Sequence, residues 1–176
     1  MYYLVYLPYS ANRTINRAYN DPNLLADRLA LATKSFEALP GMSYRPRELM
    51  FNLLLGTMSG FSPEEKMEVA DFVLSEIQRT LDGDPKNVHV VANGIAMLQP
   101  MASPEGLEQL DGLLRHLREQ APEREYTYAL SANQENLKGN HSEAIRIAEE
   151  FEALTPWVSE SLVEIKRVAR DALGDG

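Results

Sequence analysis

Residues 62–77, SPEEKMEVADFVLSEI, contain the two features that decide the fold class. Ser62 is a residue type that caps helices, and Pro63 suits the first helical position, where its missing N–H costs nothing. Glu65, three residues after Ser62, completes a capping box. Apolar residues then recur at three- and four-residue steps, at Met67, Ala70, Val73, Leu74 and Ile77. Together these features predict an amphipathic helix over residues 62–81.

The same start signal recurs along the chain. Further examples are Asp21-Pro22, Asp84-Pro85, Ser103-Pro104 and Thr155-Pro156, with weaker caps at Arg45-Pro46 and Ala121-Pro122. The strand-like run 88–91 continues into apolar residues at helical spacing, and no segment alternates for long with a period of two. The sequence therefore predicts an all-α fold of about nine helices, at 10–20, 22–39, 45–58, 62–81, 85–99, 103–120, 122–138, 141–154 and 156–173.

The prolines fall into two interleaved series. Prolines 46, 85, 122 and 156 are 39, 37 and 34 residues apart, and prolines 22, 63 and 104 are 41 and 41 apart. Such periods predict stacked antiparallel helix pairs, an α-solenoid in which helix 156–173 caps the end. The expected organisation is an extended aromatic segment over residues 1–9 and one repeat domain over 10–176. A single irregular bundle is the alternative.

Composition excludes several classes of protein. The 176 residues contain no cysteine, which removes disulfide frameworks, thiol nucleophiles and thiolate metal sites. The formal net charge of −9 disfavours nonspecific binding to nucleic acid. This charge is uneven, because residues 1–61 carry a net +2 and residues 62–176 a net −11. A candidate basic patch near the N-terminus, facing an anionic neighbour such as a lipid headgroup, comprises Arg13, Arg17, Arg45 and Arg47.

Residues 125–158 resemble a tetratricopeptide repeat. Tyr128 occupies the early aromatic position and Ala132 the first small position, and the segment Gly139 to Ala144 matches the turn between the two helices. Pro156 occupies the closing position. Glu135 replaces an expected aromatic residue, and Ala148 with Phe151 reverses the usual order of large and small side chains. The resemblance implies close helix packing at Ala132, Gly139, Ala144 and Pro156.

A broader resemblance covers most of the chain. The order of features is similar to the soluble C-terminal region of bacterial O-antigen ligase/polymerase-type membrane proteins. The matching landmarks are Tyr6-Leu7-Pro8-Tyr9-Ser10-Ala11-Asn12-Arg13, Phe36-Glu37-Ala38-Leu39-Pro40-Gly41 and Arg45-Pro46-Arg47-Glu48-Leu49. This resemblance implies a periplasmic, envelope-associated domain, close to the membrane at its N-terminus and belonging to a larger glycan-assembling protein.

Catalytic motifs are missing from the sequence. It has no phosphate loop, nucleophile elbow or His-Glu-x-x-His helix, so we expect no catalytic residue, metal site or cofactor. A stack of helix pairs instead forms a groove lined by the first helix of each pair. Amide and aromatic side chains expected to line this groove, and to suit peptide or sugar ligands, are Asn93, Tyr126, Tyr128, Asn133, Gln134 and Asn136.

Two functional hypotheses follow from these patterns. The first is a non-catalytic scaffold that forms the extracytoplasmic part of an O-antigen ligase/polymerase-type protein, with a protein or glycan-assembly component as its partner. The alternative is a stand-alone tetratricopeptide-like adaptor that binds proteins in the cytoplasm. Neither hypothesis involves nucleic acid.

Overall fold

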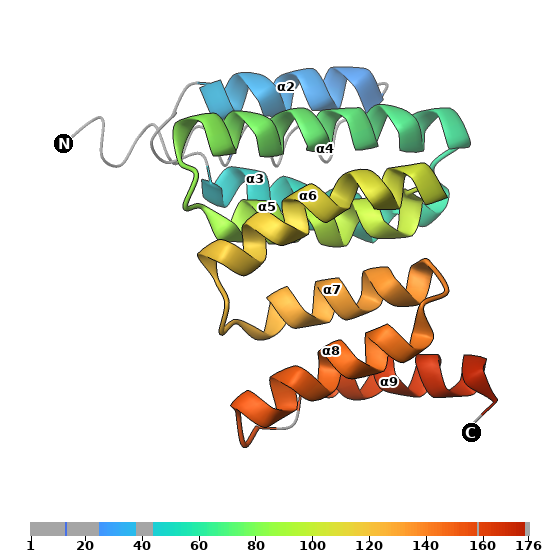
Figure 1. Cartoon of the computed structure of the whole chain (residues 1–176). Coiled ribbons are helices and arrows are strands. Elements are labelled where there is room, and N and C mark those ends of the chain that lie inside the picture. The colour runs from blue at the N-terminus through green and yellow to red at the C-terminus, as the bar shows by residue number, and fades with distance from the viewer. Residues whose placement is uncertain (1–12, 14–24, 38–43, 158, 175–176) are drawn as a thin grey trace. The chain divides into compact units, whose positions relative to one another are not determined.

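The computed structural model describes residue 13 and residues 25–37, 44–157 and 159–174, and these form two compact units, Met1–Met101 and Ala102–Gly176. Every regular element in these ranges is a helix, eight α-helices and two short 3₁₀ turns (Figure 1). The all-α prediction is therefore confirmed for this part of the chain, including residues 88–91, which are helical. Of the first predicted helix, 10–20, only Arg13 is described, and it is helical.

The first unit contains four α-helices. They are α2 (Leu25–Glu37), α3 (Tyr44–Thr57), α4 (Pro63–Gly83) and α5 (Val88–Leu98), with 3₁₀ turns η1 (Met58–Gly60) and η2 (Gln99–Met101). Helix α2 contacts α3 and α4, and α5 contacts α3 and α4. Consecutive helices run in opposite directions (Figure 1). The largest fully buried apolar side chains here belong to Phe36, Phe51, Ile77, Ile95 and Met97.

The second unit contains α6 (Pro104–Gln120), α7 (Glu125–Leu137), α8 (His141–Leu154) and α9 (Glu160–Leu173). Helix α6 contacts α7, while α7, α8 and α9 all contact one another. These helices also alternate in direction along the chain (Figure 1). The outward face of α9 is charged, since Arg167 pairs at 2.6 Å with both Glu164 and Asp171. Its opposite face buries Leu162 and Ala169, as expected of a helix that covers one end of a unit.

Four helices, α3, α4, α6 and α8, begin within one residue of the predicted start, and α4 and α6 have the predicted serine caps. The hydroxyl of Ser62 accepts a hydrogen bond from the backbone N–H of Glu65 at 3.2 Å, and the Glu65 carboxylate accepts one from the Ser62 N–H at 2.8 Å. The predicted capping box of α4 is thus confirmed. Ser103 caps α6 through one bond only, accepting a hydrogen bond from Gly106 N–H at 3.2 Å, because Gly106 has no side chain to return it.

Three predicted helix starts are wrong by three or four residues. Helices α5, α7 and α9 begin at Val88, Glu125 and Glu160, and not at the prolines at 85, 122 and 156. The fixed φ of proline suits position i+1 of a turn as well as the first position of a helix. Backbone bonds from Asn87 N to Asp84 O (3.0 Å) and from Arg124 N to Ala121 O (3.3 Å) close such turns. Asn87 and Ser159 are the actual caps of α5 and α9.

Small residues allow the second unit to pack closely. Ala132 and Ala144 are both fully buried in a core that also contains Ile147, Ala148 and Leu162. The rings of Tyr128 and Phe151 lie in the same core with centroids 5.2 Å apart. Gly139, between α7 and α8, has φ of 82°, a left-handed conformation that glycine adopts without strain. Pro156 is exposed in the turn before α9.

Replacing Ala144 by leucine tests this packing. The larger side chain has no free space in the core, so we expect the free energy of unfolding to fall by about 1–3 kcal/mol. Chemical denaturation followed by circular dichroism measures the change. Ser142→Leu is the matched control, because residue 142 is exposed on the same helix. Equal stability of the two variants would contradict the close packing of α8 at position 144.

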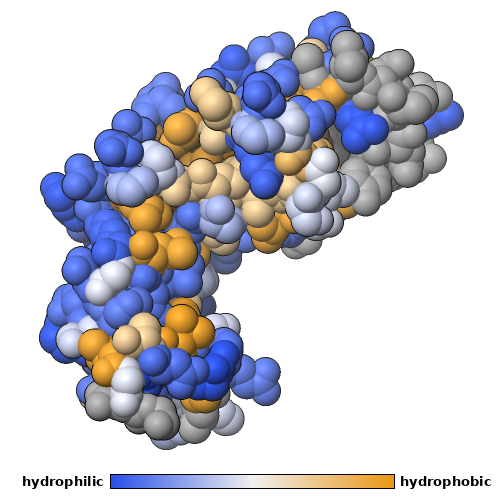
Figure 2. All heavy atoms as spheres, turned by 90° about the vertical axis from the view of Figure 1, so that its right-hand side faces the viewer, coloured by the Kyte–Doolittle hydropathy of each residue, from blue (hydrophilic) through white to orange (hydrophobic). Residues whose placement is uncertain are grey.

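No helix in the described ranges is both long enough and apolar enough to cross a membrane. On the face shown in Figure 2, hydrophilic side chains cover much of the described surface, and hydrophobic side chains form larger areas between them.

Candidate functional site

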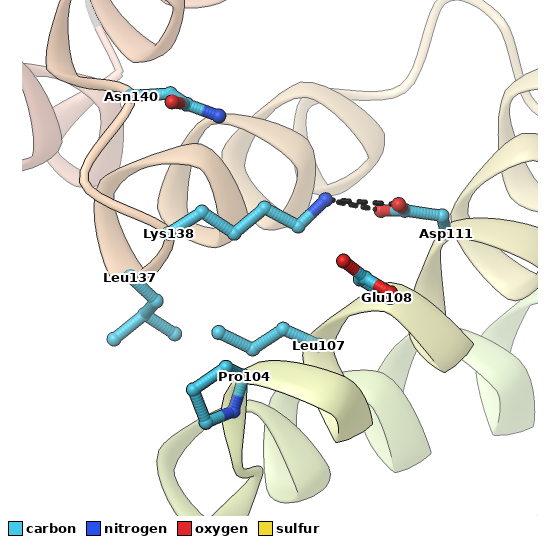
Figure 3. Close-up of a pocket in the computed structure, with 7 residues that line it drawn as sticks. All are labelled: Pro104, Leu107, Glu108, Asp111, Leu137, Lys138 and Asn140. Atoms are coloured by element: carbon cyan, nitrogen blue, oxygen red, sulfur yellow. Dashed lines mark hydrogen bonds and ion pairs between the residues drawn. The ribbon is translucent and has the colours of Figure 1, made fainter.

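The second unit contains a hollow of about 600 Å³ beside the end of α7. Figure 3 shows the side chain of Lys138 extending toward Asp111, with Glu108 near this ion pair and Leu107, Leu137 and Pro104 on the other side. Asn140 completes the lining from the turn that precedes α8. The hollow thus has one charged side and one apolar side.

A dense polar network holds the charged side in place. Lys138 Nζ donates to both carboxylate oxygens of Asp111, at 2.7 and 2.9 Å, and lies 3.3 Å from the Glu135 carboxylate. Partial burial alone would lower the pKa of Lys138, but the hydrogen bond to Asp111 and the charge of Glu135 outweigh it and raise the pKa. The fully buried side chain of Gln134 donates to Asp111 at 2.6 Å and to the Leu107 carbonyl at 2.8 Å. Lys138 therefore stays protonated and joins α7 to α6.

A second hollow, of about 410 Å³, lies among three helices of the same unit. Helix α6 contributes four residues to its lining, α7 two, the residue that follows α7 one, and α8 two. They are Asp111, Leu114, Arg115, Arg118, Ser131, Glu135, Lys138, Glu143 and Ile147. Three acids and three bases face this space together with two aliphatic side chains, and none of these nine residues is aromatic. We call this space the three-helix hollow.

The residues expected to line a groove lie elsewhere. Tyr128 packs against Phe151 inside the core, and Gln134 is fully buried in the network described above. Asn136 donates to the carbonyl of Ile165 at 2.9 Å, and its side-chain oxygen lies 3.1 Å from Nδ1 of His141. These three side chains therefore join helices, and they do not form an open surface.

The other three expected groove residues are half-buried. Tyr126 and Asn133 lie on α7, whereas Asn93 lies on α5 in the first unit. Burial raises the pKa of the Tyr126 hydroxyl, against a smaller opposing effect from Arg124. None of the six expected residues lines either hollow. The residues expected to line a groove are thus different from the residues that line the two hollows.

Sequence reasoning missed Arg115 and Arg118 for a physical reason. Charged residues at helical spacing beside a leucine stripe are typical of a solvated face, and nothing local distinguishes these two arginines. A search for charged residues flanking the stripe of α6 would have included them, along with Glu105 and Glu119, which line neither hollow.

The expected basic patch also needs correction. Arg47 is 9% exposed, its Nε donates to the fully buried Glu76 carboxylate at 2.8 Å, and its guanidinium carbon lies 4.9 Å from the Phe36 ring centre. It is a core residue, because its charge is neutralised inside the first unit. Arg13 is exposed, while Arg17 and the side chain of Arg45 lie outside the described residues.

Within the ranges that the structure describes, no group of three or more histidine, aspartate or glutamate side chains is placed to hold a metal ion. No protein-family model matches the chain, and no curated protein or solved structure matches it either. The candidate site is therefore defined by geometry alone, and the three-helix hollow is its centre.

Proposed function

We propose that this chain is a non-catalytic interaction module whose second unit binds an extended segment of a protein partner in the three-helix hollow. The observation that carries the proposal is the lining of this hollow, where α6, α7 and α8 present charged and aliphatic side chains to one space. Sites on packed helices hold their side chains more rigidly than sites on loops, and such rigidity suits specific binding.

The contact pattern of the helices supports a scaffold of stacked pairs. Helix α2 contacts α4 as well as α3, and α7 contacts α9 as well as α8. Contacts between a helix and its second neighbour are typical of helix–turn–helix repeats that share a continuous core. The tetratricopeptide-like solenoid is our interpretation of this pattern together with the proline periods.

The chemistry of the lining favours a peptide as the occupant. Leu114 and Ile147 offer aliphatic contact, while Arg115, Ser131 and Glu135 offer hydrogen-bonding groups. Alternating apolar and polar side chains of an extended peptide match such a mixed surface.

The wider context of the module is a second part of the proposal. The resemblance to O-antigen ligase/polymerase-type proteins suggests an extracytoplasmic positioning role, and a stand-alone cytoplasmic adaptor is the alternative. The entry segment 6–13 carries much of this resemblance, and only Arg13 of it is described. The full-length gene decides between them, because about ten upstream hydrophobic segments would establish the first context.

Peptide selection tests the proposed function. We expect the chain to select ligands from a random library of phage-displayed dodecapeptides. Synthetic versions of these ligands should shift the backbone amide NMR signals of Arg115, Ser131 and Ile147. Amides on the outer face of α9, at Glu164 and Asp171, are the internal control and should not move. Failure to select any peptide, or shifts confined to residues outside the hollow, would overturn the proposal.

A further inference from the structure

Arg118 occupies an unusual position in the three-helix hollow. It lines the space from α6, and its guanidinium carbon lies 5.7 Å from the centre of the Tyr128 ring. One of its terminal nitrogens, Nη2, is buried and has no hydrogen-bond partner in the described part of the chain. A buried donor without a partner is costly, and for a charged group the cost is larger. The guanidinium is thus held in place with part of its charge uncompensated.

Acidic residues that line the hollow are already paired with other cations. Asp111 and Glu135 bind Lys138. Glu143 accepts two hydrogen bonds from Arg146, at 2.7 and 2.8 Å. The hydrogen bond from Arg146 is the main cause of the lowered pKa of Glu143, and the charge of Arg118 is a small contributor. Glu143 is therefore shared between the two arginines, and its ion pair is with Arg146.

A second arginine adds to the positive charge at the end of the hollow that Arg118 lines. Arg115 lies one turn before Arg118 on α6, is exposed, and forms no ion pair with any residue that the structure describes. Residues three apart on a helix share a face, so both guanidinium groups can reach one bound anion. The positive charge of this end contrasts with the net charge of −11 over residues 62–176.

We infer that this end of the three-helix hollow binds the carboxylate of an aspartate or glutamate side chain in the partner peptide, with Arg118 and Arg115 as its ligands. The inference rests on the proposed function and specifies its chemistry. Guanidinium groups bind carboxylates through paired, charge-assisted hydrogen bonds, which are stronger than neutral ones. Stacking on Tyr128 orients Arg118 before binding, so little side-chain freedom is lost when the carboxylate arrives.

The lining favours an acidic peptide over an acidic glycan. Sugar rings are bound through aromatic faces, and none of the nine lining residues is aromatic. Leu114 and Ile147 instead offer aliphatic contact on α6 and α8. An acidic side chain flanked by a leucine, isoleucine or valine therefore fits the hollow best.

The first experiment uses the wild-type chain and the dodecapeptides that it selects. We expect aspartate or glutamate beside an aliphatic residue to be enriched. Changing that acidic residue to its amide, Glu to Gln or Asp to Asn, should weaken binding by about tenfold or more in calorimetry at low salt. This comparison needs no protein variant, so it remains decisive even if a variant fails to fold.

The second experiment changes the protein. Arg118→Met retains the aliphatic stem over Tyr128 and removes the charge, and we expect it to lose about tenfold in affinity for the acidic peptide but little for its amide version. Arg118→Lys should recover part of the loss, because it restores charge without the paired geometry. Arg167→Met, which removes an exposed arginine from α9, is the matched control and should bind as the wild type does.

The outcomes separate the inference from the proposed function. Peptides that bind in the hollow without acidic enrichment, and equally well as amides, overturn the carboxylate assignment and leave the interaction module standing. Selection of no peptide overturns both. If oligogalacturonate, an acidic oligosaccharide, displaces the selected peptides and binds more tightly than they do, the occupant is a glycan and the peptide assignment is wrong.

Discussion

Replacing Arg47 by methionine is expected to lower the free energy of unfolding by about 3 kcal/mol, one of the two largest effects that we predict. Glu76, the partner of Arg47, is fully buried, and the variant leaves its carboxylate inside the first unit without its main counter-charge. Arg79 still contacts Glu76 at 2.7 Å, which keeps the expected loss at the lower end of the range for a broken buried pair. The contact between Arg47 and the Phe36 ring is lost as well.

Chemical denaturation of single and double variants measures how much the Arg47–Glu76 ion pair contributes to the free energy of unfolding. In Arg47→Met/Glu76→Leu both charges are gone, so much of the stability should return, because an apolar pair of similar volume avoids the desolvation of two ions. Arg167→Met is the control. Its ion pairs with Glu164 and Asp171 are exposed, and such pairs contribute about 0–1 kcal/mol. The assignment of Arg47 to the core fails if Arg47→Met is no more destabilising than Arg167→Met.

Replacing Gly94 by leucine is expected to destabilise the first unit by about 3 kcal/mol. A Cβ atom at position 94 of α5 would lie 2.4 Å from Cδ1 and 2.8 Å from Cγ1 of Ile77 on α4, and 3.4 Å from a ring carbon of Phe51 on α3. Ile77 and Phe51 are each 1% exposed, so neither side chain has free space into which it can move. The absence of a side chain at Gly94 is what allows α5 to approach α4.

Gly112→Ala provides the contrast. Gly112 lies within α6, and a Cβ atom there would meet nothing within 4 Å. Alanine should therefore stabilise α6 by roughly 0.5–1 kcal/mol, through the lower backbone entropy of the unfolded chain. Thermal and chemical denaturation measure the stability of both variants. A Gly94→Leu variant as stable as the wild type would rule out the close approach of α4 and α5.

The Arg47–Glu76 ion pair and the approach of α5 to α4 at Gly94 stabilise the first unit, and neither is part of the proposed binding surface. The proposed binding surface belongs to the second unit, whereas Arg47, Glu76 and Gly94 belong to the first. Variants of the first unit that stay folded at the temperature of the assay should therefore leave peptide affinity unchanged. Variants at Arg118 should show the opposite behaviour, with altered affinity and smaller changes in stability.

The helical type of the described residues, and the approximate positions of their eight α-helices, were predictable because they depend on neighbours in the sequence. The Ser62–Glu65 box and the Ser103 cap are local hydrogen-bonding patterns, and the apolar stripe of α4 follows from helical geometry. Three start positions were misplaced because Asp84-Pro85, Ala121-Pro122 and Thr155-Pro156 suit a turn as well as a helix start. A residue a few positions later, such as Ser159, decides between a turn and a helix start, because its side chain caps the helix that follows it.

The roles of individual polar residues depended on tertiary structure. Arg47 and Arg118 are both arginines on amphipathic helices, yet one is neutralised by Glu76 and the other has a buried nitrogen without a partner. Gln134 is buried against Leu107 and Asp111, which precede it by 27 and 23 residues. By itself the sequence determined that the described chain is all-helical and where most of its helices lie, because periodicity and capping act over a single turn. Only the packing of helices distant in sequence decided which charges are neutralised, because desolvation and pairing depend on whatever neighbour the fold supplies.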